Sequence, residues 1–430
     1  MNLKFIKGRN LFALFDQALV TIYGFIYILI IVRTLPQVEM GYLMLEEAVR
    51  FFLSALSDGS IGQAQIKYLS GCEPEERGDI IATGLIMKLM VLGGAFILVF
   101  VFRGLFADLM QSPALSTLLL MAPLIILSKL LHNHGRHILV ARQEYFRLFC
   151  LDLVFSLIFL SLLFGGKYLT GLDTAMKVLW VSVISGFAVT LALPLFVKGR
   201  WAFGRYNRMW ARKQYIFARD IFINTAGYWL YQRTDQLMLG AMVNPVAVAV
   251  YSIAGHFFKV FQLLNEAFNL VVLPGTSKIS RNKDILTFEE NRQVKKLYFS
   301  NGIILQSLAA LLGLFLFITA DWLIVFLFGA DYADAALVLK IMLIGLVAVP
   351  FARLAGSVIA GLGRPDICAK ITWITGGINL ALNFVLIPKI GMAGAAVSSS
   401  ASLVCMLVMY SFVLKKKLSV HSVGQADTSI

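Results

Sequence analysis

Apolar runs about twenty residues long recur along this chain, and no other feature constrains its fold as strongly. The hydrocarbon core of a bilayer is about 30 Å thick, so a helix needs roughly 20 mostly apolar residues to cross it. Hydrophobic residues fill 59% of the 430 positions and charged residues only 14%. Mean hydropathy is +0.80, outside the range of soluble globular domains. We therefore expect an integral membrane protein.

The runs predict an all-α protein with twelve membrane-spanning helices. No segment alternates polar and apolar residues as an outer-membrane strand does, and helices otherwise satisfy every backbone group in lipid. We expect spans at 11–32, 40–60, 81–101, 114–131, 148–165, 176–197, 217–240, 246–274, 297–319, 335–361, 370–388 and 393–414.

Basic residues predict the orientation, because lysine and arginine concentrate in cytoplasmic connections. Most of the 38 lysines and arginines lie at the termini and in the even-numbered connections. Those in the odd-numbered connections are Arg33, Arg103, Lys167, Lys177 and Lys389. Both termini should therefore be cytoplasmic, with the protein in the cell inner membrane. The net charge of +14 then reflects topology or contact with anionic lipid headgroups, and needs no nucleic-acid partner.

Several chemistries are not expected. The four cysteines, Cys72, Cys150, Cys368 and Cys405, lack CxxC spacing, so neither disulfides nor a zinc site is predicted. The sequence HNHGRH at 132–137 could bind a metal, but no carboxylate or cysteine stands at ligand spacing, and we expect none. Without a GxxxxGK[ST] pattern or a soluble segment large enough for catalysis, we expect neither an enzyme nor a cofactor.

The two halves of the chain resemble each other weakly. A shift of 209 residues aligns LPQVEMGYLMLEEAVRFF (35–52) with NPVAVAVYSIAGHFFKVF (244–261) and pairs Arg50 with Lys259. A shift of 222 pairs Arg142 with Arg364. We therefore expect two pseudo-symmetric six-helix lobes related by an axis along the membrane normal. The predicted organisation is an N-terminal lobe (1–197), a basic cytoplasmic linker (198–216), a C-terminal lobe (217–414) and a cytoplasmic tail (415–430).

Ionisable residues deep in the membrane predict a functional site, because such groups normally face a cavity or a partner. Arg50, Lys259 and Arg353 lie far from the ends of their predicted spans, whereas Lys129, Asp152 and Lys340 lie near span ends, where they can snorkel to the interface. In the second span, Glu46 precedes Arg50 by four residues, which allows an ion pair.

Helical spacing groups further polar residues into stripes. The stripe of the eighth span is Tyr251, Gly255, Lys259, Gln262, Glu266 and Asn269, and that of the seventh is Asn224, Tyr228, Tyr231, Gln232 and Asp235. Such stripes either line a cavity or hold helices together. Matching cations in both halves favour a cavity for an anionic substrate such as a phosphate. His256 could couple transport to protons, but packing is its expected role.

Several motifs resemble those of a transporter family. YQRTDQLMLGAMVNPVAVAVYSIA (231–254), LFGADYADAALVLKIMLIG (327–345) and GLGRPDICAKITWITGGINLALNFVLIPKIGMAGAAVSSS (361–400) are similar to segments of bacterial polysaccharide exporters. The chain thus resembles the oligosaccharide flippases of the Wzx and polysaccharide-transporter type, within the MOP superfamily that also contains MATE antiporters and the lipid II flippase MurJ. In the early element VRTLPQVEMGYL the chain departs from the usual Gly-Pro-x-x-Phe form.

The resemblance implies a flippase that moves a polyprenyl-diphosphate-linked oligosaccharide outward by alternating access. Its implied partners are membrane lipids, a polysaccharide polymerase and glycosyltransferases. From depth and stripe we expect Arg50, Lys259 and Arg353 to bind the diphosphate. Hydroxyl groups of the sugar would meet Gln17, Tyr228, Gln232 and Gln262. An ion gradient would act through Glu266, Glu46 or Asp235. The alternatives are a MATE-like exporter of cationic drugs and a membrane scaffold that transports nothing.

Overall fold

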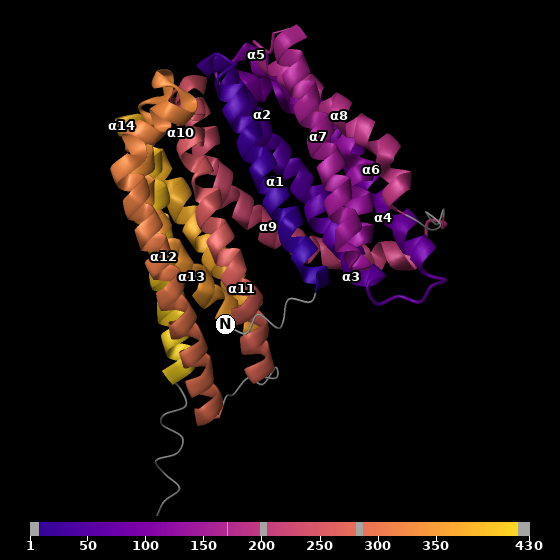
Figure 1. Cartoon of the computed structure of the whole chain (residues 1–430), viewed down its shortest axis with the longest axis vertical. Helices are drawn as coiled ribbons and strands as arrows, with labels where there is room; N and C mark the ends of the chain where they lie inside the picture. Colours follow the sequence, from indigo (N-terminus) through magenta and orange to yellow (C-terminus); the bar gives the residue numbers. More distant parts are fainter. Residues whose placement is uncertain (1–7, 170, 198–203, 281–286, 420–430) are drawn as a thin grey trace, which may run out of the picture. The chain divides into compact units, whose positions relative to one another are not determined.

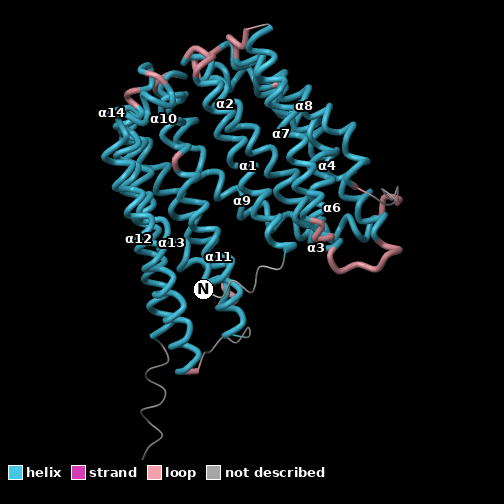
Figure 2. Tube along the Cα trace, in the orientation of Figure 1, coloured by secondary structure: helices cyan, strands magenta, loops and turns pink. Residues whose placement is uncertain are grey.

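The computed structural model describes residues 8–169, 171–197, 204–280 and 287–419. These residues form helices joined by short turns, with no strand among them (Figure 2). Nine helices in the described ranges are long and apolar enough to cross a membrane. The expectation of an all-helical membrane protein is therefore confirmed.

The chain divides into two compact units. Unit 1 comprises Met1–Trp229 with Asn244–Val246, and unit 2 comprises Leu230–Val243 with Ala247–Ile430. The division falls within α9 (Arg208–Met242), and the expected linker at 198–216 lies partly outside the described residues. The units are defined by contacts between residues, whereas the expected lobes are defined by membrane spans. The lobe boundaries given above therefore stay a prediction.

Unit 1 is built around α6, which packs against α2, α3, α4, α7 and α8, while α1 packs along α7. Figure 1 shows α6, α7 and α8 side by side. Besides the start of α9, the helices of this unit are α1 (Gly8–Val32), α2 (Gln37–Ser54), the π-helix η2 (Ala55–Gly62), α3 (Gln63–Leu69), α4 (Arg77–Leu109), α5 (Pro113–Leu119), α6 (Met121–Ala141), α7 (Tyr145–Leu169) and α8 (Ala175–Phe196).

Unit 2 is built around α13, which packs against α11, α12 and α14. Its further helices are α10 (Pro245–His256), α11 (Phe258–Ser280), α12 (Phe288–Phe328), the 3₁₀ turn η3 (Ala330–Tyr332), α13 (Ala335–Gly361) and α14 (Pro365–Ser419). Thr287 and Glu290 begin α12 with a capping box. Ile390 (φ −135°) and Gly391 (φ 56°) leave helical geometry, so α14 consists of two helices joined at a kink.

The nine apolar helices and the twelve expected spans differ for identifiable reasons. Spans 370–388 and 393–414 both fall in α14, which is continuous apart from its kink. The helices that carry spans 40–60 and 217–240 fail on composition for different reasons. The 18 residues of α2 include four charged ones, whereas α9 contains many neutral polar residues. Residues 37–69 nevertheless continue as helix through α2, η2 and α3.

The expected eighth span is interrupted. Residues 246–274 were expected to form one span with a single polar stripe, and Pro245–Glu266 is one of the nine apolar helices. Within it, however, α10 ends at His256 and α11 begins at Phe258. The turn is closed by the Phe257 N–H, which donates to the Ala254 carbonyl at 3.2 Å. Tyr251 and Lys259 therefore lie on either side of this one-residue turn, and their shared face stays a prediction.

The backbone repeats itself between the two units. Gln111, Gln143 and Gly171 in unit 1 have positive φ, and so do Gly329, Gly363 and Gly391 in unit 2. Gln143 follows the end of α6 and Gly363 follows the end of α13, and the two turns have equivalent hydrogen bonds. Glu144 N donates to Leu139 O at 2.9 Å, and Arg364 N donates to Ile359 O at 3.2 Å.

A shift of 220 residues relates the turns at 143 and 363, and also Gly171 and Gly391. The backbone thus aligns Glu144 with Arg364, two residues away from the match made on sequence, which paired Arg142 with Arg364. Similar residue types at neighbouring positions of a short turn explain the wrong register.

Candidate functional site

Arg50 and Glu46 form the ion pair that their spacing in α2 allows. Arg50 Nε lies 3.0 Å from Glu46 Oε1 and 3.2 Å from Oε2. The Glu46 side chain is fully buried, whereas that of Arg50 is 25% exposed. Among the described residues, the bonds of Arg50 all run through Nε, so the two terminal nitrogens of the guanidinium remain available for an anion.

Lys129 belongs to the same cluster, and its expected place at a span end is wrong. It interacts electrostatically with Arg50, Glu46 and Glu47, and its Nζ lies 5.0 Å from the centre of the Phe155 ring. The predicted span ended at residue 131, but α6 runs to Ala141. Lys129 is therefore half-buried in the middle of a helix, too far from its end to snorkel easily.

The polar sequence at 132–137 connects α6 to its neighbours in unit 1. His132 Nε2 lies 3.0 Å from Asp152 Oδ1 on α7. Arg136 pairs with the same carboxylate at 2.9 Å and with Asp16 on α1 at 3.6 Å. Gln65 Nε2 on α3 lies 3.3 Å from Nδ1 of His134. Asp152 is 3% exposed, so the expectation that it snorkels is also wrong.

A second buried charge pair extends this network to the π-helix. Lys88 on α4 is fully buried and donates to Asp58 Oδ1 at 2.9 Å. Asn133 donates to Asp58 Oδ2 at 2.7 Å, and His137 Nδ1 lies 3.0 Å from Lys88 Nζ. π-helical turns occur frequently at functional sites. The sequence interpretation assigned no role to Asp58 or Lys88, because their partners lie far away in sequence.

Asp235 occupies a different environment, inside unit 2. Its carboxylate is buried and accepts hydrogen bonds from Tyr251 on α10 and from Ser399 and Asn383 on the two halves of α14. All three donors are neutral, and within the described ranges no basic side chain pairs with Asp235. Asn383 Oδ1 is also buried, with no hydrogen-bond partner among the described residues. A buried carboxylate beside an unused amide oxygen is suited to a proton or a small cation.

The remaining expected site residues are spread over both units. Lys259 and Glu266 on α11 are exposed, Gln262 between them is half-buried, and Asn269 accepts from Ser357 at 2.6 Å. Four more are placed as follows: Gln17 is exposed on α1, Tyr228 is half-buried in the unit 1 part of α9, Gln232 is half-buried in its unit 2 part, and Arg353 is half-buried on α13. Side chains of Asn224 and Tyr231 lie outside the described set.

Comparison with known proteins identifies the group of membrane proteins that this chain resembles. A family described as "Polysaccharide biosynthesis protein" matches residues 8–280. The "Probable low-salt glycan biosynthesis flippase Agl15" of Haloferax volcanii is 24% identical over 269 residues, which are 60% of this chain and 53% of the relative. The chain thus spans about half the length of the curated relatives it matches.

Two solved structures share the fold. "Lipid II flippase MurJ, inward closed conformation" has a TM-score of 0.70 at 14% identity and covers 95% of this chain and 88% of that one. An inward-facing MATE family multidrug transporter of the MOP superfamily has a TM-score of 0.77 at 13% identity, with 94% and 96% coverage. At such low identity these likenesses show a MOP-type transporter fold alone.

Proposed function

We propose that this chain, which belongs to the polysaccharide biosynthesis protein family, is a flippase for a lipid-linked glycan. It would move a polyprenyl-diphosphate-linked oligosaccharide from the cytoplasmic to the outer face of the inner membrane by alternating access. The product would serve the synthesis of a surface polysaccharide such as O-antigen, capsule or exopolysaccharide. A polymerase and glycosyltransferases would act on either side of this step.

The observation that carries the proposal is the state of Arg50. A buried glutamate holds Nε of this arginine, which fixes the guanidinium and leaves its terminal nitrogens for a ligand. Two parallel N–H groups on a fixed plane suit the oxygens of a phosphate. Lys129, in the same cluster, supplies the second positive charge that a diphosphate needs once Glu46 has neutralised part of Arg50.

The C-terminal half would also supply contacts to the substrate. We assign to Lys259 the role of a second diphosphate contact, because it is exposed on α11 at a depth where a lone ammonium is costly in lipid. Arg353 would assist it, while Gln17, Tyr228, Gln232 and Gln262 would meet the sugar. The polyprenyl chain would remain in lipid.

The topology that we propose has twelve spans in two lobes and both termini in the cytoplasm. Its support is the helical continuation through α2, η2 and α3, the kink that divides α14, and the turns that recur 220 residues apart. The distribution of lysine and arginine supports the orientation.

Coupling to an ion gradient would use Asp235. Of the three acidic residues considered, Glu46 is paired with Arg50 and Glu266 is exposed. Asp235 is buried among neutral donors, so a proton or a monovalent cation would neutralise it without competition from a fixed cation. Binding there would change the packing of α9, α10 and α14, the helices that supply the ligands.

Transport in proteoliposomes tests this function. The substrate is a short polyprenyl diphosphate that carries a disaccharide and a fluorophore, and dithionite reports the fraction exposed outside. Wild-type protein should accelerate exchange between leaflets, and Arg50→Gln should reduce the rate at least tenfold. The surface variant Arg364→Gln serves as the control. An unchanged rate in Arg50→Gln protein that folds normally would refute the role of this arginine.

The same vesicles examine the alternatives. Accelerated release of a cationic dye, without movement of the diphosphate lipid, would assign the protein to ion-coupled drug export instead. If neither substrate moves, the scaffold hypothesis becomes the better account.

A further inference from the structure

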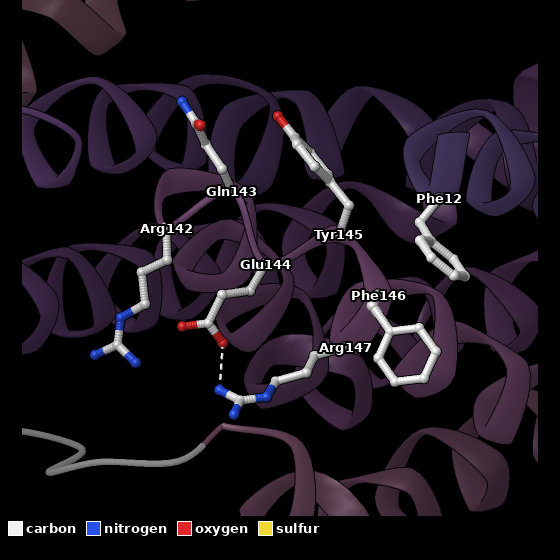
Figure 3. Close-up of a pocket in the computed structure, with 7 residues that line it drawn as sticks. All are labelled: Phe12, Arg142, Gln143, Glu144, Tyr145, Phe146 and Arg147. Atoms are coloured by element: carbon white, nitrogen blue, oxygen red, sulfur yellow. Dashed lines mark hydrogen bonds and ion pairs between the residues drawn. The ribbon is translucent and has the colours of Figure 1, made fainter. Parts of the chain in front are cut away.

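A cavity of about 400 Å³ lies at the turn between α6 and α7, and its lining shares no residue with the clusters described above. It is lined by Phe12 on α1 and by the six residues 142–147 (Figure 3). All of these residues belong to unit 1. The cavity stands where two apolar helices end, Pro113–Ala141 and Tyr145–Leu169, which is the level of a membrane–water interface.

The charged lining is net positive. Arg142, Glu144 and Arg147 extend to the same side of the turn in Figure 3. Glu144 Oε2 accepts from Arg147 Nη1 at 2.5 Å, and the lining holds one carboxylate against two guanidinium groups in all. The Arg147 side chain is 38% exposed and Arg142 is exposed as well. An anion that enters the cavity can therefore reach both arginines from water.

The other part of the lining is aromatic and faces outward. The rings of Phe12 and Phe146 meet edge to face at 5.0 Å, and Phe15 and Phe149 continue the cluster along α1 and α7. Phe146 is 57% exposed and Phe15 is 46% exposed. Exposed phenylalanines on helices that cross a membrane present their rings to lipid. The cavity thus combines a basic part with an apolar wall.

We propose that this cavity binds the headgroup of an anionic membrane phospholipid. Its phosphodiester would lie between Arg142 and Arg147, and the first carbons of an acyl chain would pack on Phe12 and Phe146. The face concerned is the one that the basic residues assign to the cytoplasm. Pockets of this composition between membrane helices recognise anionic headgroups. The site is separate from transport, and its existence does not depend on the function proposed above.

The equivalent turn in unit 2 provides a matched control. Arg364 follows the left-handed residue Gly363 there, as Glu144 follows Gln143 in unit 1. Both oxygens of Asp366 hold its guanidinium, each at 2.9 Å. Pro365 and Asp366 take the places of the aromatic residues Tyr145 and Phe146. Arg364→Gln removes an exposed arginine from the same kind of turn without altering the cavity.

The experiment titrates short-chain phosphatidylglycerol into the full-length protein in detergent and measures bound lipid by native mass spectrometry. Phosphatidylcholine and inorganic phosphate are titrated in parallel. One arginine beside an anionic lipid surface changes affinity by about fivefold, so the double variant Arg142→Gln/Arg147→Gln should weaken phosphatidylglycerol binding about 25-fold. Arg364→Gln should leave it unchanged.

Two further variants separate the proposal from general damage to the fold. Glu144→Gln removes the competing carboxylate and should strengthen binding about threefold, since it cancels part of one opposing charge. Phe146→Ser should weaken lipid binding and leave phosphate binding as it was. Equal affinity of the wild type and the double arginine variant would overturn the site. Equal binding of phosphatidylcholine would do the same, and competition by inorganic phosphate at the lipid's own affinity would reassign the site to a soluble anion.

Discussion

The pair of Lys88 and Asp58 should dominate the stability of unit 1, and its energy can be worked out from the contacts. Lys88 is fully buried, and Asp58 is 15% exposed. Removing one partner of a buried ion pair costs about 3–5 kcal/mol, because the other charge stays buried without compensation. Asp58→Leu should cost an amount near the upper end of this range, because the Lys88 ammonium is then left with His137 as its only remaining partner among those described above. Lys88→Met should reach the lower end, because Asn133 still donates to the carboxylate.

The double variant distinguishes pairing from simple loss of packing. Replacing both charges by apolar groups is often neutral, although Asn133 and His137 would each lose a partner, at about 1–3 kcal/mol apiece. The double variant should therefore lose about 2–6 kcal/mol, less than the sum of the single losses.

Reversible unfolding in mixed SDS micelles measures these free energies. The control is Lys340 with Asp321, an ion pair at 2.5 Å whose side chains are 26% and 72% exposed. Losing such an exposed pair should cost under about 1 kcal/mol. Two results would refute the reasoning. One is a Lys88 or Asp58 single variant that loses no more free energy of unfolding than the Lys340 and Asp321 control. The other is a double variant whose loss equals the sum of the two single losses.

Three further predictions follow from individual contacts. In Gly41→Ala, the new Cβ would clash with the backbone of Pro245, so the free energy of unfolding should fall by about 1–3 kcal/mol. An unchanged value would show that α2 shifts without cost. Thr287→Ala removes the capping box of α12 and should cost about 1 kcal/mol in the same unfolding assay, whereas no loss would mean that packing alone sets the start of this helix. Asp235→Asn should make transport in proteoliposomes insensitive to an imposed ion gradient while diphosphate binding persists; a gradient response equal to wild type would exclude Asp235 from coupling.

The sequence predicts those features that depend on neighbouring residues. Apolar runs locate the helices, and the four-residue spacing of Glu46 and Arg50 indicates the ion pair that forms. Asp235 stands out because a carboxylate in an apolar run needs partners. Its actual ligands, Asn383 and Ser399, lie about 150 residues away, and periodicity within one helix cannot find them.

The misplaced residues share a physical cause. The polar sequence at 132–137 suggests the end of a span, but partners on five other elements satisfy these side chains, so α6 continues to Ala141. Lys129 and Asp152 thereby become deeper than expected. The turn at Phe257 contains no proline, and most of the residues around it are apolar. The sequence therefore predicts a continuous helix there.

The central claim is that Arg50 and Lys129, which lie in one cluster of unit 1, hold the same diphosphate, and a double-mutant cycle on binding tests it most directly. Farnesyl diphosphate is titrated calorimetrically into wild type, Arg50→Gln, Lys129→Gln and the double variant. Two cations on one ligand should be coupled by about 0.5–3 kcal/mol, whereas independent sites add within about 0.5 kcal/mol. Losses of binding free energy that add in the double variant would contradict the claim. Single variants that bind farnesyl diphosphate as tightly as the wild type would contradict it too.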